Sequence, residues 1–344
     1  MSIDRRKVLG GIGAATVASV VGMPHVARGA GKVQLTVANG SPLKHVLSHL
    51  GTTPWIDRVK ELTNDEVEIK YFPAAQLAKL KELLAAVQNG VADIAPIPIG
   101  YAGDKMPLNG VSALPGLGAS SDSIVNAHAK ALEDGPLRQE FDANHIHPMY
   151  VMAFPPYQLV GMEKNWRTLD DIKGKVLRSS GGTMNLVVSA LGASAAAMPA
   201  GEMYLALQRG TVDGTISAFA SVKGYNIQEI AKSMSANASF GTFVNILACN
   251  KKKWASLPKE IQNALNQAGR DITASASAAM DQSTEELKIE FTEVGMDIYD
   301  FASDELAKIN GRLETVHGDW VKRLTDRGVP AADVLKDYKS VIGA

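Results

Sequence analysis

Arg178 is the residue of this sequence whose type and setting best suit the binding of an anion. It ends a short apolar run, residues 175–178, that is predicted to be a strand, and two serines and the pair Gly181-Gly182 follow at once. A guanidinium offers parallel N–H donors that match a carboxylate, and glycines let backbone and ligand approach closely. Two interpretations are open: an arginine that binds a carboxylate beside Gly181, or a solvated arginine at a strand end.

The sequence contains no recognisable catalytic or metal-binding constellation. His45 and His49 have helical spacing but lack an H-E-x-x-H motif and a third ligand, so surface or capping histidines are the simpler interpretation. Neither a G-x-S-x-G elbow nor a phosphate-binding loop is present. Asp170, Asp171 and Asp213 suit caps and turns. We therefore expect a binding protein without metal or cofactor, and not an enzyme.

The composition indicates a globular protein with about two domains. The chain has 344 residues, 46% of them hydrophobic, and a formal net charge of −1. This length is enough for two separate cores. No basic stripe is present, which argues against a nucleic-acid partner. The single cysteine, Cys249, excludes an intramolecular disulfide and a cysteine-based metal cluster.

Residues 1–29 are predicted to be a signal peptide. Arg5, Arg6 and Lys7 precede an uncharged run and then small residues, the order of an export signal, and the paired arginines indicate the twin-arginine route. The uncharged run is too short and too rich in glycine for a membrane span. We therefore expect a periplasmic protein. Because this route often serves cofactor enzymes, an exported cofactor-containing enzyme is the alternative.

The first half of the remaining chain has the pattern of an open α/β sheet. Strands are predicted at residues 32–39, 66–72 and 91–99, with helices at 42–62 and 77–89 between them. This order favours a mainly parallel sheet with helices on both sides.

A short sequence pattern that occurs twice indicates a second lobe. In both Val87–Asp93 and Leu207–Asp213, a helix ends in Gln-x-Gly and the chain returns through an aspartate into a strand. Two extended runs, residues 149–159 and 243–250, are predicted to cross between the lobes as a hinge.

The last third of the chain is predicted to be mostly helical. Residues 258–293 form either one long helix, which Gly269 could kink, or two shorter helices that meet near Gly269. Residues 303–327 are predicted to form a further helix.

The segment from 169 to 217 resembles the solute-binding proteins of TRAP (tripartite ATP-independent periplasmic) transporters, the DctP-like family. The run G-K-V-L-R that ends at Arg178, the pair Met198-Pro199, and the run L-Q-x-G-x-V-D-G that ends at Gly214 carry this resemblance. It extends from about Val33 to the C-terminal helices. It implies an α/β, two-lobed periplasmic-binding-protein fold with a long C-terminal helix that braces both lobes.

The domain boundaries expected from this fold follow the two crossings. Lobe I is predicted to contain residues 30–155 and 244–284. Lobe II is predicted to contain residues 156–243 and 285–344, including the C-terminal helices.

The resemblance also implies a ligand pocket. Arg178 falls where the family has a carboxylate-binding arginine. Gln158 and Ser217 stand where several members have a second arginine and an asparagine, and Pro98 stands near a position that is acidic in some members. An aromatic position of the family is about Ala200 here. The other predicted ligand-binding residues are Gly181, Tyr157, Trp55, Phe219, Phe240 and Phe243.

These departures leave fewer polar partners for a second carboxylate or a polyol. They favour a small organic acid with one carboxylate and an apolar or aromatic body. A C4-dicarboxylate or keto acid is the other interpretation, with polarity supplied by other side chains. The resemblance implies that the receptor closes over the acid and delivers it to the membrane subunits of a TRAP permease. It leaves open a homodimer and a sensor that presents the same fold to a signalling receptor.

Overall fold

The computed structural model describes residues 32–343 of the 344-residue chain. The predicted signal peptide at residues 1–29 lies outside the described residues. Within residues 32–343, no helix is both long and apolar enough to cross a membrane.

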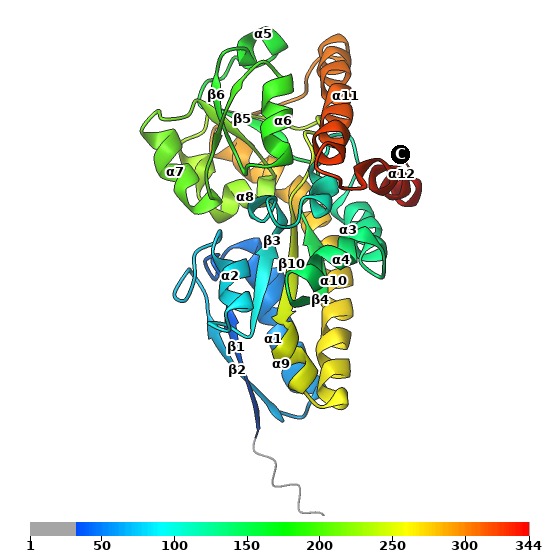
Figure 1. Cartoon of the computed structure of the whole chain (residues 1–344). Coiled ribbons are helices and arrows are strands. Elements are labelled where there is room, and N and C mark those ends of the chain that lie inside the picture. Colours follow the sequence, from blue (N-terminus) through cyan, green and yellow to red (C-terminus); the bar gives the residue numbers. More distant parts are fainter. Residues whose placement is uncertain (1–31, 344) are drawn as a thin grey trace, which may run out of the picture. The chain divides into compact units, whose positions relative to one another are not determined.

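A five-stranded sheet forms the centre of lobe I (Figure 1). Its order is β2 (Val67–Phe72), β1 (Val33–Ala38), β3 (Ile94–Pro98), β10 (Val244–Asn250) and β4 (Ile146–Ala153). β1 pairs in parallel with β2 and β3, whereas β10 runs antiparallel to β3 and β4. All five residues of β3 are buried, as the apolar sequence of a central α/β strand predicts.

The helices of lobe I surround this sheet. They are η1 (Leu47–Thr52), α1 (Thr53–Leu62), α2 (Leu83–Gln88), η2 (Ile99–Tyr101), η3 (Leu108–Ala113), α3 (Ser121–Ala131), α4 (Pro136–Ala143) and α9 (Lys251–Ser256). The prediction for residues 77–89 was wrong in extent, because α2 begins only at Leu83. The residues just before it form a turn, in which the backbone N–H of Glu82 donates to the carbonyl of Lys79 at 2.8 Å and the Glu82 carboxylate accepts from the backbone N–H of Lys79 at 3.1 Å.

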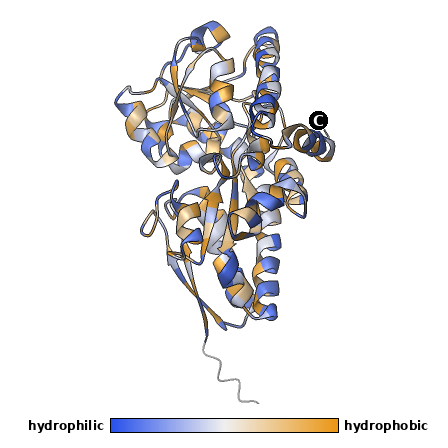
Figure 2. Cartoon of the chain, viewed as in Figure 1, coloured by the Kyte–Doolittle hydropathy of each residue, from blue (hydrophilic) through white to orange (hydrophobic). Residues whose placement is uncertain are grey.

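A six-stranded sheet forms the centre of lobe II. Its order is β11 (Asp297–Tyr299), β9 (Ser233–Ser235), β5 (Gln158–Gly161), β8 (Gly214–Ser217), β6 (Val176–Ser179) and β7 (Ser194–Ala197). The accompanying helices are α5 (Leu169–Ile172), α6 (Thr183–Ala190), α7 (Ala200–Gln208), α8 (Phe219–Gly224) and η4 (Ile227–Glu229). Figure 2 shows hydrophobic residues gathered on the strands at the centre of the lobe I sheet. The predicted two-lobed α/β fold is therefore confirmed.

The repeated sequence pattern corresponds to the same side-chain to backbone hydrogen bond in both lobes. The carboxylate of Asp93 accepts from the backbone N–H of Thr36 at 2.8 Å, and that of Asp213 accepts from Val176 at 2.7 Å. Each aspartate thus connects the chain entering β3 or β8 with the neighbouring parallel strand. Asp213 was expected to satisfy its own turn, and the structure shows that it bonds a distant strand.

The two predicted crossings lie against each other. The backbone N–H of Phe154 donates to the carbonyl of Phe243 at 3.2 Å, and that of Tyr157 donates to Gly241 at 2.8 Å. Because the crossings are bonded together, their few residues must absorb any rotation between the lobes.

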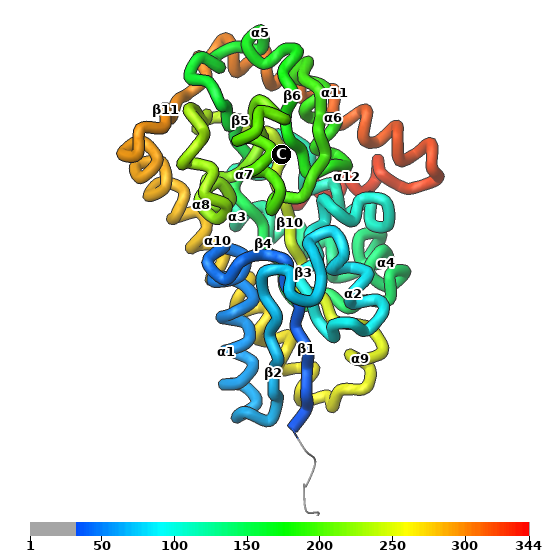
Figure 3. Tube along the Cα trace, turned by 90° about the vertical axis from the view of Figure 1, so that its left-hand side faces the viewer, coloured from blue at the N-terminus to red at the C-terminus, as the bar shows by residue number. Residues whose placement is uncertain are grey.

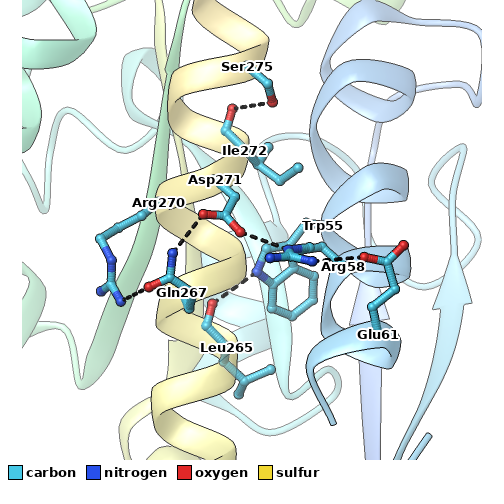
Figure 4. Close-up of polar contacts among 9 residues, drawn as sticks. All are labelled: Trp55, Arg58, Glu61, Leu265, Gln267, Arg270, Asp271, Ile272 and Ser275. Carbon is cyan, nitrogen blue, oxygen red and sulfur yellow. Dashed lines mark hydrogen bonds and ion pairs between the residues drawn. The ribbon is translucent and has the colours of Figure 1, made fainter. Parts of the chain in front are cut away.

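A continuous helix, α10 (Lys259–Glu293), spans 35 residues, so the alternative of two shorter helices is wrong. It packs on α1, α3 and β4 in lobe I and on α8 and β11 in lobe II, and Figure 3 shows α1 beside it. Trp55 and Arg58 of α1 bond the Leu265 carbonyl and the Asp271 carboxylate at 3.3 and 2.7 Å (Figure 4). The chain ends with α11 (Ser303–Thr325) and α12 (Ala331–Ile342).

Gly269 lets α10 approach the sheet closely. A Cβ at this position would lie 2.1 Å from the carbonyl oxygen of Met149 in β4, which is far inside contact distance. The glycine that suggested a kink is therefore needed for packing against backbone, which cannot yield as a flexible side chain can.

We predict that Gly269→Ala lowers the free energy of unfolding by roughly 1–3 kcal/mol, because α10 and β4 must separate. Gly311→Ala in α11 is the matched control, since its Cβ would meet no described atom within 4 Å. This control should stabilise the protein by up to about 1 kcal/mol through helix propensity. Urea denaturation measures both, and equal effects of the two substitutions would contradict the packing role of Gly269.

Candidate functional site

A small cavity lies where the lobes and the two crossings meet. Its free volume is about 20 Å³, which is room for about one water. The lining residues come from lobe I, the crossings and lobe II: Ser41, His45, Leu47, Leu80, Pro98 and Tyr101; Phe154, Tyr157, Phe243 and Asn245; Arg178, Ala200, Ser221 and Tyr225. A small organic molecule can occupy this place only when the lobes part or side chains move.

Arg178 lies in β6 on the lobe II side of this cavity and is only 3% exposed. Its Nε and Nη2 donate to the carbonyl oxygen of Met198 at 3.1 and 2.8 Å, and Nη2 also donates to the hydroxyl of Tyr101 at 3.0 Å. These acceptors are neutral, and no carboxylate within residues 32–343 forms an ion pair with the guanidinium. The interpretation of Arg178 as a solvated arginine is therefore wrong.

Tyr101 connects the lobes at Arg178. It ends η2, which directly follows β3, and its hydroxyl oxygen accepts from Arg178 and, at 2.9 Å, from the backbone N–H of Ala200. Ala200 begins α7, so a helix N-terminus and a guanidinium donate to one oxygen. Sequence reasoning missed Tyr101, although its place just after a predicted strand end was a usable signal.

Two side chains in the lining carry buried polar atoms that lack a partner within the described residues: Nε2 of His45 and Oδ1 of Asn245. Burial, with a smaller effect of nearby His49, lowers the pKa of His45 to about 3. The ring is therefore neutral at physiological pH. The expectation of a surface or capping histidine is wrong for His45, which is 1% exposed.

Tyr157 and Tyr225 add phenol rings to the wall. Burial raises the pKa of both hydroxyl groups above the usual value for tyrosine, so both remain protonated. Tyr225 packs on His45 with ring centres 4.7 Å apart, and Tyr157 packs on Phe154 at 6.0 Å. The wall is thus aromatic on several sides.

Four of the ten predicted site residues line this cavity: Arg178, Tyr157, Phe243 and Pro98. The structure places Gln158 and Ser217 opposite each other in the β5–β8 ladder. The amide of Gln158 donates to the Ala238 carbonyl at 2.6 Å and accepts from the Ser235 hydroxyl at 2.9 Å. It therefore ties β5 to the β9 segment.

Three predicted aromatic residues pack elsewhere. Trp55 is fully buried between α1 and α10, Phe219 stacks on Phe291 with ring centres 5.8 Å apart, and Phe240 meets Phe301 edge-on. The structure does not bring them to the cavity of Arg178.

Gly181 lines an adjoining cavity of about 290 Å³ between the lobes. This second cavity shares Tyr101 and Phe243 with the cavity of Arg178. Their rings pack with centres 5.3 Å apart. Movement of these two rings would join both spaces into one of a size usual for small-molecule sites.

No group of His, Cys, Asp and Glu side chains in residues 32–343 is suited to hold a metal ion. The chemistry available at the site is thus a buried cation, a neutral imidazole, an amide and several phenols. Two α/β lobes that are joined by paired crossings, with these groups at their junction, define a bilobal ligand-binding protein.

The chain belongs to the bacterial extracellular solute-binding proteins, family 7 (DctP), whose family profile matches residues 41–323. This confirms the resemblance to the solute-binding proteins of TRAP transporters. The chain is 25% identical over 297 residues to the outer membrane transporter protein TsaT of Comamonas testosteroni, and the match covers 85% of this chain and 86% of that protein.

Solved structures share this fold. A marine metagenome TRAP solute-binding protein specific for aromatic acid ligands, in complex with metahydroxyphenylacetate, aligns with a TM-score of 0.85 and 22% identity over 91% of this chain and 99% of that one. A TRAP solute-binding protein of Rhodoferax ferrireducens with copurified benzoate gives a TM-score of 0.85 and 20% identity, covering 91% and 98%.

We predict that Tyr101→Phe destabilises the protein without ligand by about 1–3 kcal/mol, since the backbone N–H of Ala200 loses its side-chain acceptor and Arg178 retains only the Met198 carbonyl. Tyr204→Phe is the matched control, because no hydrogen bond of its hydroxyl is found among residues 32–343. Chemical denaturation without ligand measures the difference. Equal stability of both variants would show that the Tyr101 bonds do not stabilise the unliganded state.

Proposed function

We propose that this protein is the periplasmic receptor of a TRAP transporter and binds a small organic acid by its carboxylate at Arg178. The observation that carries the proposal is a guanidinium that is 3% exposed and has only neutral acceptors. An uncompensated buried charge is unfavourable by several kcal/mol. A ligand carboxylate supplies the missing negative charge through short, charge-assisted hydrogen bonds.

The position of Arg178 favours this role further. Met198 holds one edge of the guanidinium through Nε and Nη2, which leaves Nη1 without a partner among the described residues. The Tyr101 oxygen marks a point on which Arg178 and the first N–H of α7 both converge. A carboxylate oxygen near this point would meet a guanidinium and a helix N-terminus together.

The cavity wall favours an acid with a single carboxylate and an apolar or aromatic body. Arg178 is the only lining residue that is cationic at neutral pH, because His45 is neutral. A second carboxylate would therefore enter without a counter-charge, whereas a ring would pack against Phe154, Tyr157 and Phe243. The aromatic acid and the benzoate bound by the two structural relatives are consistent with this choice.

In the proposed receptor, the two lobes close over the ligand. We place their boundaries as the sequence suggested, with residues 30–155 and 244–284 in lobe I and residues 156–243 and 285–344 in lobe II. A ligand that contacts Arg178 from lobe II and the lobe I wall favours the closed state by its differential affinity. Closure then presents the acid to the membrane subunits of the permease.

Family membership supports a receptor rather than an exported cofactor enzyme. Periplasmic location and export by the twin-arginine route remain part of the proposal and follow from the N-terminal sequence. A homodimer and a signalling partner are not needed for the proposed binding step.

We expect Arg178→Gln to reduce affinity for the acid that wild type binds by at least about 30-fold, because the carboxylate loses its buried counter-ion. Calorimetry with benzoate, mandelate and succinate measures this loss. Arg209→Gln is the matched control: it removes an exposed arginine at the end of α7 and should leave affinity unchanged. Undiminished binding by Arg178→Gln would refute the carboxylate role.

A further inference from the structure

The cavity of Arg178 contains two further polar groups that the lobes do not satisfy. We propose that the acid carries a hydroxyl group, which accepts a hydrogen bond from His45 and donates one to Asn245. This inference rests on the proposed function and specifies its ligand class. The inference concerns the hydroxyl group of the ligand and not its carboxylate.

His45 offers a hydrogen-bond donor. Its Nδ1 accepts from the backbone N–H of Leu47 at 3.2 Å, which places the single proton of the neutral ring on Nε2. That N–H is buried and has no acceptor within the described residues. Gly224 leaves it little freedom to turn away, since a Cβ there would lie 2.4 Å from Cδ2 of the imidazole.

Asn245 of β10 offers a hydrogen-bond acceptor to the same cavity. It lies in β10, where it pairs with Pro98 on one side and with Met152 on the other, and its side chain lines the cavity. The residue is 2% exposed, and its Oδ1 has no donor within residues 32–343. β10 pairs with β3 and β4 through its backbone, so the sheet does not need the Asn245 side chain.

Unpaired buried polar atoms are rare in folded proteins, so two in one cavity call for a common partner. The partner must accept from an imidazole N–H and donate to an amide oxygen. A hydroxyl does both. A keto oxygen can only accept and would leave Asn245 unpaired, and an unsubstituted ring would leave both groups unpaired. Each buried group left unpaired weakens binding, so the cavity discriminates against such acids.

The test compares acids that differ only in the hydroxyl. Calorimetry on the mature protein is run with benzoate and its 2-, 3- and 4-hydroxy derivatives, and with phenylacetate and mandelate. We expect at least one hydroxy acid to bind at least about tenfold tighter than its parent acid.

Two substitutions locate the hydroxyl. Asn245→Leu should reduce this ratio to about one, because leucine fills the same space without an acceptor. His45→Phe should reduce the ratio in the same way. His49→Phe is the matched control on the exposed side of the same segment and should preserve the ratio. Cooperative thermal unfolding of each variant confirms that it is folded.

The outcomes separate this inference from the proposed function. If wild type binds parent and hydroxy acids equally, or if the preference survives in Asn245→Leu, the hydroxyl site is wrong and the carboxylate receptor stands. If no acid in the series binds wild type, the proposed function fails and the hydroxyl site fails with it. A preference that disappears in both variants and persists in the control supports the site.

Discussion

The hydrogen bonds from the Arg178 guanidinium to the Met198 carbonyl are the interaction on which the proposed site depends. β6 and β7 run in parallel with Arg178 opposite Ala196, so the chain leaving β7 brings Met198 beside the arginine two residues later. The backbone N–H of Met198 returns a bond to Ser179, which fixes the loop that carries the carbonyl. The charge is thus oriented by backbone yet not neutralised, and it remains available to an anion.

The rest of the fold brings lobe I to this charge and limits how it can move. α10 packs along both lobes and approaches β4 closely at Gly269, while the two crossings are bonded to each other near Phe154 and Phe243. Any relative motion of the lobes would therefore be concentrated in a few crossing residues. Tyr101, whose hydroxyl accepts from the guanidinium, belongs to lobe I, whereas Arg178 belongs to lobe II. In the proposed receptor, a ligand carboxylate that replaces the Tyr101 oxygen would therefore couple binding to movement of the lobes.

The sequence was sufficient for features that depend on local pattern, and insufficient for those that depend on contacts between lobes. The alternation of strands and helices along the chain and the division into two lobes follow from periodicity and turn residues. The resemblance implies the long helix and points to Arg178. The place of Tyr101 after a strand was visible in the sequence, but its bonds to Arg178 and Ala200 were not, because both partners belong to the other lobe. The burial of His45 appears only on folding. Trp55, Phe219 and Phe240 were chosen as aromatic residues, and aromatic type alone does not distinguish a helix interface from a ligand wall. The predicted start of α2 was wrong because a turn between Lys79 and Glu82 replaces the first helical turn.

The central claim is that a buried positive charge selects a carboxylate, and comparing benzoate with benzamide tests it most directly. The two molecules have nearly the same shape and differ in charge, so calorimetry on the wild-type protein isolates the electrostatic contribution. We predict that benzoate binds at least about 100-fold more tightly than benzamide, because only the anion compensates Arg178. Equal affinities, or tighter binding of benzamide, would contradict the account.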